Sequence, residues 1–277
     1  MEKLDRLGWA AGVSLTSYGV RVGIRVNDPQ VLTRLPECLP PGAKPAQSPL
    51  SERLYSLVSA GNSPQSNLRI RRLNLLYRNA ERLARTDDFE QILERLGADL
   101  QLYVAESAKR RIFVHAGVVG WRGQAVVIPG RSFSGKSTLV AEMIRAGATY
   151  YSDEYAVLDS RGRVHPYSRP LSIRENGSVK QRQLPAEAFG AKSGVDPLPV
   201  GLIMVTQYQL GATWRPRRIS PGRGVLALLA NTVSARRQPK KALGTLQQVA
   251  SRATILKGVR GEANQVVDSI IRILEAL

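Results

Sequence analysis

Apolar residues occupy every second position of residues 20–26, with Arg, Gly and Arg between them. A period of two with β-branched side chains predicts a half-buried strand. Asp28-Pro29 interrupts this pattern and predicts a short helix through Leu35. Five prolines in residues 36–49 indicate a loop, and residues 51–60 are expected to form another strand.

A longer helix is predicted to begin at Thr86-Asp87-Asp88, where a capping side chain and acidic residues precede an apolar pattern. Positions 89, 92, 93 and 96 are apolar at helical spacing, and a helical stretch continues to Ala108. We therefore expect the main domain boundary between residues 105 and 112. This divides the chain into a smaller α+β N-terminal domain, residues 1–108, and a second domain, residues 109–277.

The second half of the chain carries denser signals. An apolar run over 112–119, a turn at 121–123 and a strand over 125–128 predict a hairpin. Helical spacing follows over 139–144 and stops at Gly147, and short strands are expected at 150–151, 155–158 and 201–206. Apolar residues from 266 to 274 predict a C-terminal helix. Strands joined by hairpins and mixed with helices indicate an α/β fold with mixed sheets.

Composition narrows the class of protein. Hydrophobic residues make up 43% of the 277 positions, which is enough to bury a core. Cys38 is the only cysteine, which excludes an intrachain disulfide and fits a reducing cytoplasm. The first residues mix charges without a long apolar stretch behind them, so no signal peptide is predicted, and no segment approaches the ~20 apolar residues of a membrane span. We expect a cytoplasmic protein.

The formal net charge is +18, which attracts phosphate-rich or acidic partners. The basic residues are scattered in short clusters such as Lys109-Arg110-Arg111, and there is no basic tail or zinc-finger spacing. The pattern therefore does not favour nucleic acid as the partner, although an ATPase that acts on nucleic acid stays an alternative.

Residues 130–137 match G-x-x-x-x-G-K-[ST] at every fixed position. Glycines let the backbone amides turn toward phosphate oxygens, and the following helix directs its positive end to the same point. Lys136 is expected to reach the β- and γ-phosphates, and the Ser137 hydroxyl to bind Mg²⁺. The predicted nucleotide-binding residues are Gly130, Arg131, Ser132, Phe133, Ser134, Gly135, Lys136, Ser137 and Thr138.

Two adjacent carboxylates, Asp153 and Glu154, follow the next predicted strand, and Asp153 lies 17 positions after Lys136. A carboxylate at a strand end beside a phosphate loop can hold Mg²⁺ or take a proton from a hydroxyl group. The alternative is a solvated turn, because Asp and Glu are common in turns. The predicted metal ligands are Ser137, Asp153 and Glu154.

Together with three further segments, these residues resemble the catalytic domain of the HPr kinase/phosphorylase family and, more distantly, the phosphoenolpyruvate carboxykinase-like fold. The resemblance extends from Phe113 to the C-terminus. The segments occur in the same order: His115-Ala116-Gly117, the phosphate loop, Ser152-Asp153-Glu154, residues 168–174, and Pro221-Gly222-Arg223.

The resemblance implies an ATP- and Mg²⁺-dependent kinase in which Asp153 is the base toward a serine-type hydroxyl. It also implies that His115 lies near the phosphates, that Arg223 stabilises the transferring phosphoryl group, and that a homo-oligomer forms. Glu154 stands where the family has a second aspartate, and Ser172 replaces the family's glutamate, which puts the reverse, phosphorylase reaction in doubt. The acceptor is expected to be a protein, a peptide or a small hydroxyl compound.

Less specific interpretations stay open for two of these residues. His115 follows an apolar run and is equally compatible with a hydrogen-bonded core histidine. Arg223 follows Pro-Gly and is compatible with an exposed turn. The loss of the glutamate at Ser172 also leaves open a non-catalytic module in which nucleotide binding regulates a partner.

Overall fold

The computed structural model describes residues 2–60, 73–131, 134–174, 181–190 and 192–276. The chain divides into two compact units, Met1–Lys109 and Arg110–Leu277, which we call unit 1 and unit 2. This division lies one residue after the expected boundary between residues 108 and 109. Unit 1 carries 15 Lys and Arg against 12 Asp and Glu, and unit 2 carries 25 against 10, so most of the net charge belongs to unit 2.

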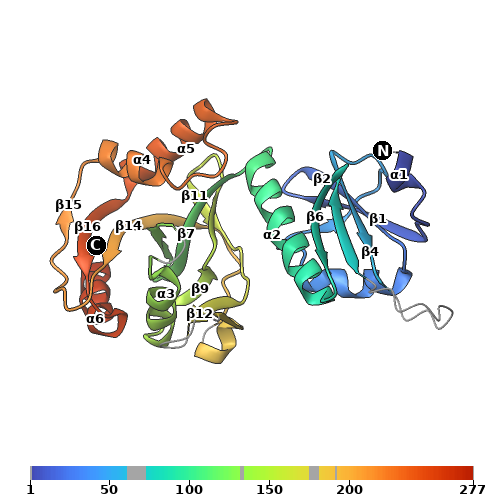
Figure 1. Cartoon of the computed structure of the whole chain (residues 1–277). Helices are drawn as coiled ribbons and strands as arrows, with labels where there is room; N and C mark the ends of the chain where they lie inside the picture. Colours follow the sequence, from blue (N-terminus) through green and yellow to red (C-terminus); the bar gives the residue numbers. More distant parts are fainter. Residues whose placement is uncertain (1, 61–72, 132–133, 175–180, 191, 277) are drawn as a thin grey trace. The chain divides into compact units, whose positions relative to one another are not determined.

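Unit 1 contains a six-stranded sheet with the strand order β3-β1-β2-β4-β5-β6. Strands β2 and β4 are parallel, and the other neighbours are antiparallel. Helix α2 lies along the sheet (Figure 1). The elements are α1 (Glu2–Asp5), β1 (Ala11–Ser17), β2 (Val20–Val26), η1 (Pro29–Glu37), β3 (Lys44–Pro45), β4 (Arg53–Val58), β5 (Asn74–Arg78), β6 (Glu81–Thr86) and α2 (Phe89–Ser107).

The period-two pattern is confirmed by β2, whose apolar side chains point inward and are buried in the core of unit 1. Asp28 caps η1, and Asp88 caps α2 by accepting a hydrogen bond from the backbone N–H of Glu90, so both predicted helix starts are confirmed. One face of α2 packs Ile92, Leu96 and Val104 into the same core. Strands β5 and β6 were not predicted.

Unit 2 is built on an eight-stranded sheet with the order β11-β10-β7-β8-β14-β16-β15, in which β9 also pairs with β7. Strands β12 and β13 form a separate pair. The strands are β7 (Ile112–Trp121), β8 (Gln124–Pro129), β9 (Thr149–Ser152), β10 (Tyr155–Leu158), β11 (Arg163–His165), β12 (Leu171–Arg174), β13 (Gln181–Leu184), β14 (Leu198–Tyr208), β15 (Arg217–Arg218) and β16 (Thr254–Arg260). The helices are α3 (Lys136–Arg145), η2 (Ala186–Phe189), α4 (Pro221–Leu229), α5 (Pro239–Arg252) and α6 (Ala263–Glu275).

Helices cover both faces of this sheet. Helices α3 and α6 pack on one face and α4 and α5 on the other, each pair over its own apolar cluster (Figure 1). Parallel pairs (β8–β14 and β14–β16) occur together with antiparallel pairs (β7–β8 and β7–β10), so the expected mixed α/β fold is confirmed. The predicted hairpin is β7–β8, and its turn has Arg122 and Gly123 at positive φ, which suits a two-residue turn.

The three parallel strands determine where a site can form. The carboxyl ends of β8, β14 and β16 lie at one edge of the sheet, and they lead into the phosphate loop, Tyr208 and Arg260. Ligands of open α/β sheets usually bind outside the carboxyl ends of such strands. None of the helices in the described part of the chain is long and apolar enough to cross a membrane.

Candidate functional site

The phosphate loop leaves β8 after Pro129 and enters α3 at Lys136. Gly135 caps the helix at φ +80°, a conformation that other residues rarely adopt, and its carbonyl accepts the first helical bond from Leu139 (3.2 Å). The first backbone N–H groups of a helix have no partner within it, so α3 offers donors to an anion. The strand, turn and helix that the motif requires are present around this loop. Ser132 and Phe133 lie outside the described residues.

Lys136 is turned into the loop. Its side chain is only 6% exposed, and its Nζ donates to the carbonyl of Arg131 at 2.7 Å. Burial lowers the pKa of Lys136, and the charges of Asp153 and Glu154 oppose this shift. The ammonium group therefore stands inside the curve of the loop, between the backbone and the acidic pair.

Two loop residues complete the lining. The Oγ of Ser134 is buried and has no hydrogen-bond partner among the described residues. A Cβ at Gly130 would lie 2.8 Å from this Oγ, so a larger residue at the first motif position would displace the Ser134 side chain. Arg131 and Thr138 are exposed at the start of the loop and on the first turn of α3.

Asp153 follows β9 and faces the start of α3. Its Oδ2 accepts a weak bond from the backbone N–H of Ser172 (3.4 Å), and its buried Oδ1 has no partner. Burial raises the pKa of Asp153 to about 6, although hydrogen bonds from Ser137 and Ser172 and the charge of Lys136 lower it. A carboxylate that is buried beside a helix start and only partly satisfied suits a ligand or proton-acceptor role better than a solvated turn.

Glu154 and His115 form the next part of the site. His115 Nε2 lies 3.4 Å from Glu154 Oε1, and Nδ1 lies 2.8 Å from the carbonyl oxygen of Gly130. A carbonyl oxygen only accepts, so Nδ1 carries a proton and ties the histidine to the loop. Burial raises the pKa of Glu154, but the hydrogen bond and charge of His115 and the charges of Arg169 and Lys136 outweigh it and leave that pKa below its ordinary value.

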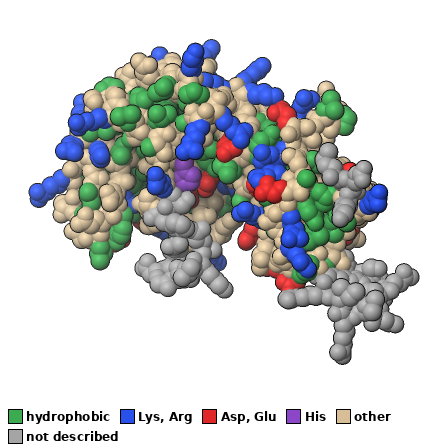
Figure 2. Space-filling model, turned by 45° about the horizontal axis from the view of Figure 1, so that its top comes forward, with side chains coloured by type: hydrophobic (Ala, Val, Ile, Leu, Met, Phe, Trp, Pro, Cys, Tyr) green, Lys and Arg blue, Asp and Glu red, His purple; other side chains and the backbone are tan. Residues whose placement is uncertain are grey.

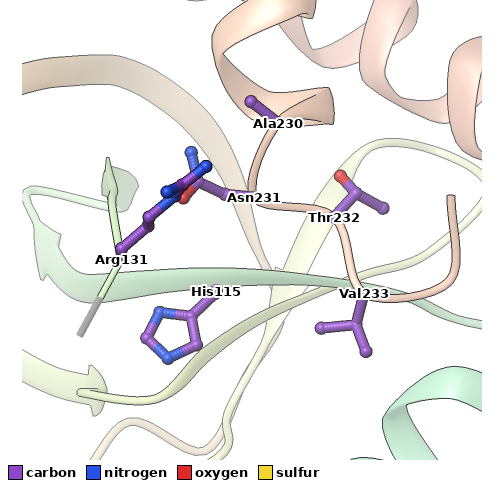
Figure 3. A pocket seen from close by; sticks show the side chains of 6 residues that line it. All are labelled: His115, Arg131, Ala230, Asn231, Thr232 and Val233. Atoms are coloured by element: carbon purple, nitrogen blue, oxygen red, sulfur yellow. The ribbon is translucent and has the colours of Figure 1, made fainter.

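His115 also lines a cavity of about 330 Å³ (Figure 3). The strand β8 pairs with β7 only up to the position of His115, where the loop departs. Beyond this point the connection from α4 to α5 forms the backbone hydrogen bonds with β7. The N–H of His115 donates to the carbonyl of Asn231 (2.7 Å), and the N–H of Val233 donates to the carbonyl of Phe113 (2.9 Å). The cavity lies between these two segments and is lined by His115, Arg131, Ala230, Asn231, Thr232 and Val233.

Arg223 does not join this cluster through any described contact. It is exposed on the first turn of α4, where its backbone N–H meets the capping Ser220 Oγ at 3.5 Å. Within the described part of the chain, no hydrogen bond or ion pair connects Arg223 with the loop, His115 or the acidic pair. Its predicted contact with a phosphoryl group stays a prediction.

The predicted metal ligands provide few protein donors. Among the described residues, no group of three or more His, Cys, Asp and Glu side chains could hold a metal ion. Ser137, Asp153 and Glu154 nevertheless fit Mg²⁺, which commonly takes one or two carboxylates together with substrate phosphates and water. The Oδ1 of Asp153 has no partner among the described residues and is available either to Mg²⁺ or to a proton.

Sequence patterns did not single out Tyr208 and Arg260, which lie opposite each other at the ends of β14 and β16. Arg260 contacts the carbonyl of Gly135, 125 positions earlier in the chain. The available signal was Arg260-Gly261, a basic residue followed by glycine. This pair indicates a site only when β16 is known to lie beside β14.

The Lys and Arg side chains of the molecule are dispersed over the visible face and do not gather in one basic patch (Figure 2). No protein-family model matches this sequence, and no curated protein sequence matches it significantly. The function of this chain is therefore inferred from the residues and the geometry of the site.

Proposed function

We propose that the chain is an ATP- and Mg²⁺-dependent kinase of the HPr-kinase-like class, with unit 2 as its catalytic domain in a phosphoenolpyruvate carboxykinase-like fold. The reaction transfers the γ-phosphoryl group to a serine-type hydroxyl of a protein, a peptide or a small molecule. The support comes from a phosphate loop, a buried carboxylate and a histidine–glutamate pair within one edge of the sheet.

The observation that carries this proposal is the buried position and the raised pKa of Asp153. Its Oδ1 is buried without a partner, its charge acts on Lys136, and its pKa is raised by burial to about 6. A general base works best when its pKa lies close to the working pH. At pH 7 to 8 this carboxylate is mostly ionised and can accept a proton.

The chemical step then follows from the positions of the groups. The acceptor oxygen attacks the γ-phosphorus and gives its proton to Asp153, while the bond between that phosphorus and the β–γ bridging oxygen breaks and ADP leaves. Lys136 and the amides at the start of α3 stabilise the charge on the phosphates. Mg²⁺, held by Ser137 and Asp153 or Glu154, would neutralise further phosphate charge. His115 fixes the position of Glu154 relative to the loop, because its two ring nitrogens contact Glu154 and the carbonyl of Gly130.

The test is the Asp153→Asn substitution in the full-length protein. Asn keeps the size of the side chain but cannot accept the proton, so transfer from labelled ATP to a product in cell extract should fall by about 100-fold or more. Affinity for Mg-ATP should stay within about threefold, because the loop is unchanged. Asp268→Asn, at an exposed position of α6, is the matched control.

Retained transfer in Asp153→Asn would contradict the role of this residue as the base. A second candidate function, a nucleotide-binding module without catalysis, is favoured by Ser172, since only a backbone N–H stands there beside Asp153. Tight binding of Mg-ATP by the unaltered protein without any labelled product would support that module and contradict the kinase.

A further inference from the structure

Arg260 is the last residue of β16 and is almost completely buried, with 1% of its surface exposed. Its Nη2 donates to the carbonyl oxygen of Gly135 at 2.7 Å, and its Nη1 donates to the carbonyl oxygen of Gly261 at 3.0 Å. Its Nε is buried and has no hydrogen-bond partner within the part of the chain that the structure describes. The guanidinium group therefore lies directly beneath the phosphate loop.

This buried cation has no carboxylate against it. In the described residues no Asp or Glu forms an ion pair with Arg260, and Glu262, whose charge favours the protonated guanidinium, accepts a bond from the Tyr208 hydroxyl at 2.6 Å. Burial lowers the pKa of Arg260, but a guanidinium group stays protonated in proteins. Burying a charge is costly unless it is paired, so this arrangement calls for an anion.

The start of α3 and the side chain of Lys136 add further positive charge beside the phosphate loop. The first turn of α3 carries the positive end of the helix dipole, and the ammonium of Lys136 is buried within the loop. Asp153 and Glu154 act on Lys136, whereas neither contributes to the shift of Arg260. On the Arg260 side of the loop, the charge of Glu262 acts on the guanidinium, but among the described residues no carboxylate forms an ion pair with it.

The hydrogen bond from Arg260 to the Gly135 carbonyl also affects the peptide group at the start of α3. The peptide group between Gly135 and Lys136 has its carbonyl at Arg260 and Leu139, and its N–H is the first donor of α3 on the opposite side. A charged donor at the carbonyl polarises this peptide group and makes its N–H a stronger donor. A Cβ at Gly135 would lie 2.6 Å from Nη2, so the glycine of the motif is required for this contact as well as for its positive φ.

We propose that Arg260 is a positioning residue of the phosphate loop and that the polyphosphate of the bound nucleotide supplies the negative charge that its guanidinium lacks. This inference rests on the proposed nucleotide binding. It goes beyond the motif, because it makes residues at the end of β16 part of the phosphate site. It also explains why an arginine occupies a position that is almost completely buried.

The test compares Arg260→Met with the unaltered full-length protein. Methionine fills a similar space without charge, so the unfolding temperature without nucleotide should equal or exceed that of the unaltered protein. The dissociation constant for Mg-ATP, measured by calorimetry, should rise by about 10- to 100-fold, the factor that follows the loss of a charge-assisted hydrogen bond. Arg260→Lys keeps the charge and should fall between the two, and Lys257→Met, at an exposed position of β16, should change neither quantity.

A purely structural arginine predicts the opposite pattern. The proposal would be overturned if Arg260→Met, without nucleotide, unfolded at a lower temperature than the unaltered protein. It would also be overturned if the unaltered protein bound Mg-ATP and Arg260→Met bound it with the same affinity. Failure of the unaltered protein to bind Mg-ATP would overturn the proposed function itself, and with it this role of Arg260.

Discussion

Asp99 in unit 1 and Asp153 in unit 2 are both carboxylates largely withdrawn from water, but their surroundings differ. Asp99 is 10% exposed and accepts hydrogen bonds from the Tyr55 hydroxyl (2.7 Å) and Arg78 (2.8 Å), with Arg53 at 3.6 Å. Asp153 receives a weak backbone bond from Ser172 and a side-chain bond from Ser137, and its Oδ1 has no partner among the described residues. The carboxylate of unit 1 is satisfied by the protein, and that of unit 2 is not.

The same contrast extends to other polar atoms. Seven buried side-chain polar atoms in the described part of the chain, in Ser17, Trp121, Ser134, Asp153, Trp214, Ser234 and Arg260, have no hydrogen-bond partner, and only Ser17 Oγ belongs to unit 1. Three of the others, Ser134 Oγ, Asp153 Oδ1 and Arg260 Nε, belong to the loop or to residues that act on it. Buried polar groups normally find partners, so a concentration of unsatisfied ones indicates a place prepared for a ligand.

The largest effect on stability is expected from breaking the satisfied network of unit 1. Asp99→Leu leaves Tyr55 and Arg78 without their partner and should lower the free energy of unfolding of unit 1 by about 3 kcal/mol. Hydrogen exchange followed by mass spectrometry should show the loss of protection within residues 1–109 only. Glu94→Gln, exposed on the same helix, is the control, and a change in Mg-ATP affinity would contradict the assignment of Asp99 to stability alone.

A smaller effect, of opposite sign, is expected at Asp153. Because burial raises its pKa from 3.8 to about 6, the ionised form is disfavoured in the folded state, and the cost in stability builds up between these two pH values and is complete above them. Asp153→Asn should therefore stabilise the ligand-free protein by about 1–2 kcal/mol at pH 8, after allowance for partial exposure. In urea unfolding experiments the gain should be nearly constant from about pH 8 to pH 7 and should shrink between about pH 6 and pH 4, and a gain that grows toward acid would show that the sign is wrong.

The smallest effect should come from an exposed ion pair of unit 2. Arg122 donates to Glu275 at 2.8 Å, but their side chains are 68% and 41% exposed. Glu275→Gln should change the free energy of unfolding by less than about 0.5 kcal/mol, since exposed pairs contribute little. A larger loss of unfolding free energy in the same urea experiments would mean that exposed ion pairs stabilise the protein as much as the buried network of unit 1 does.

Local patterns were sufficient for much of the fold. The alternation over β2, the capped start of α2, the β7–β8 hairpin and the C-terminal helix α6 were all predicted, because each depends on neighbouring residues. Strands β1, β5, β6 and β16 and helices α4 and α5 were missed. Strand β6 carries two arginines within six residues, and β16 becomes recognisable only through its parallel neighbour β14.

The site divides in the same way. The loop, Asp153 and Glu154 were found because a motif and an adjacent pair are local features, and the structure brings them together with His115. Arg260 depends on a contact across 125 positions, which no local pattern contains. Arg223 has no described contact with the cluster, so a role for it requires an acceptor or a nucleotide in place.

A calorimetric titration of Mg-ATP into the full-length protein and into Lys136→Met probes the phosphate loop itself. We expect one nucleotide to bind per chain of the unaltered protein and the affinity of the variant to be at least about tenfold weaker, because the buried ammonium is lost from the loop. No heat of binding with the unaltered protein, or equal affinity in the two proteins, would contradict a polyphosphate site at residues 130–137.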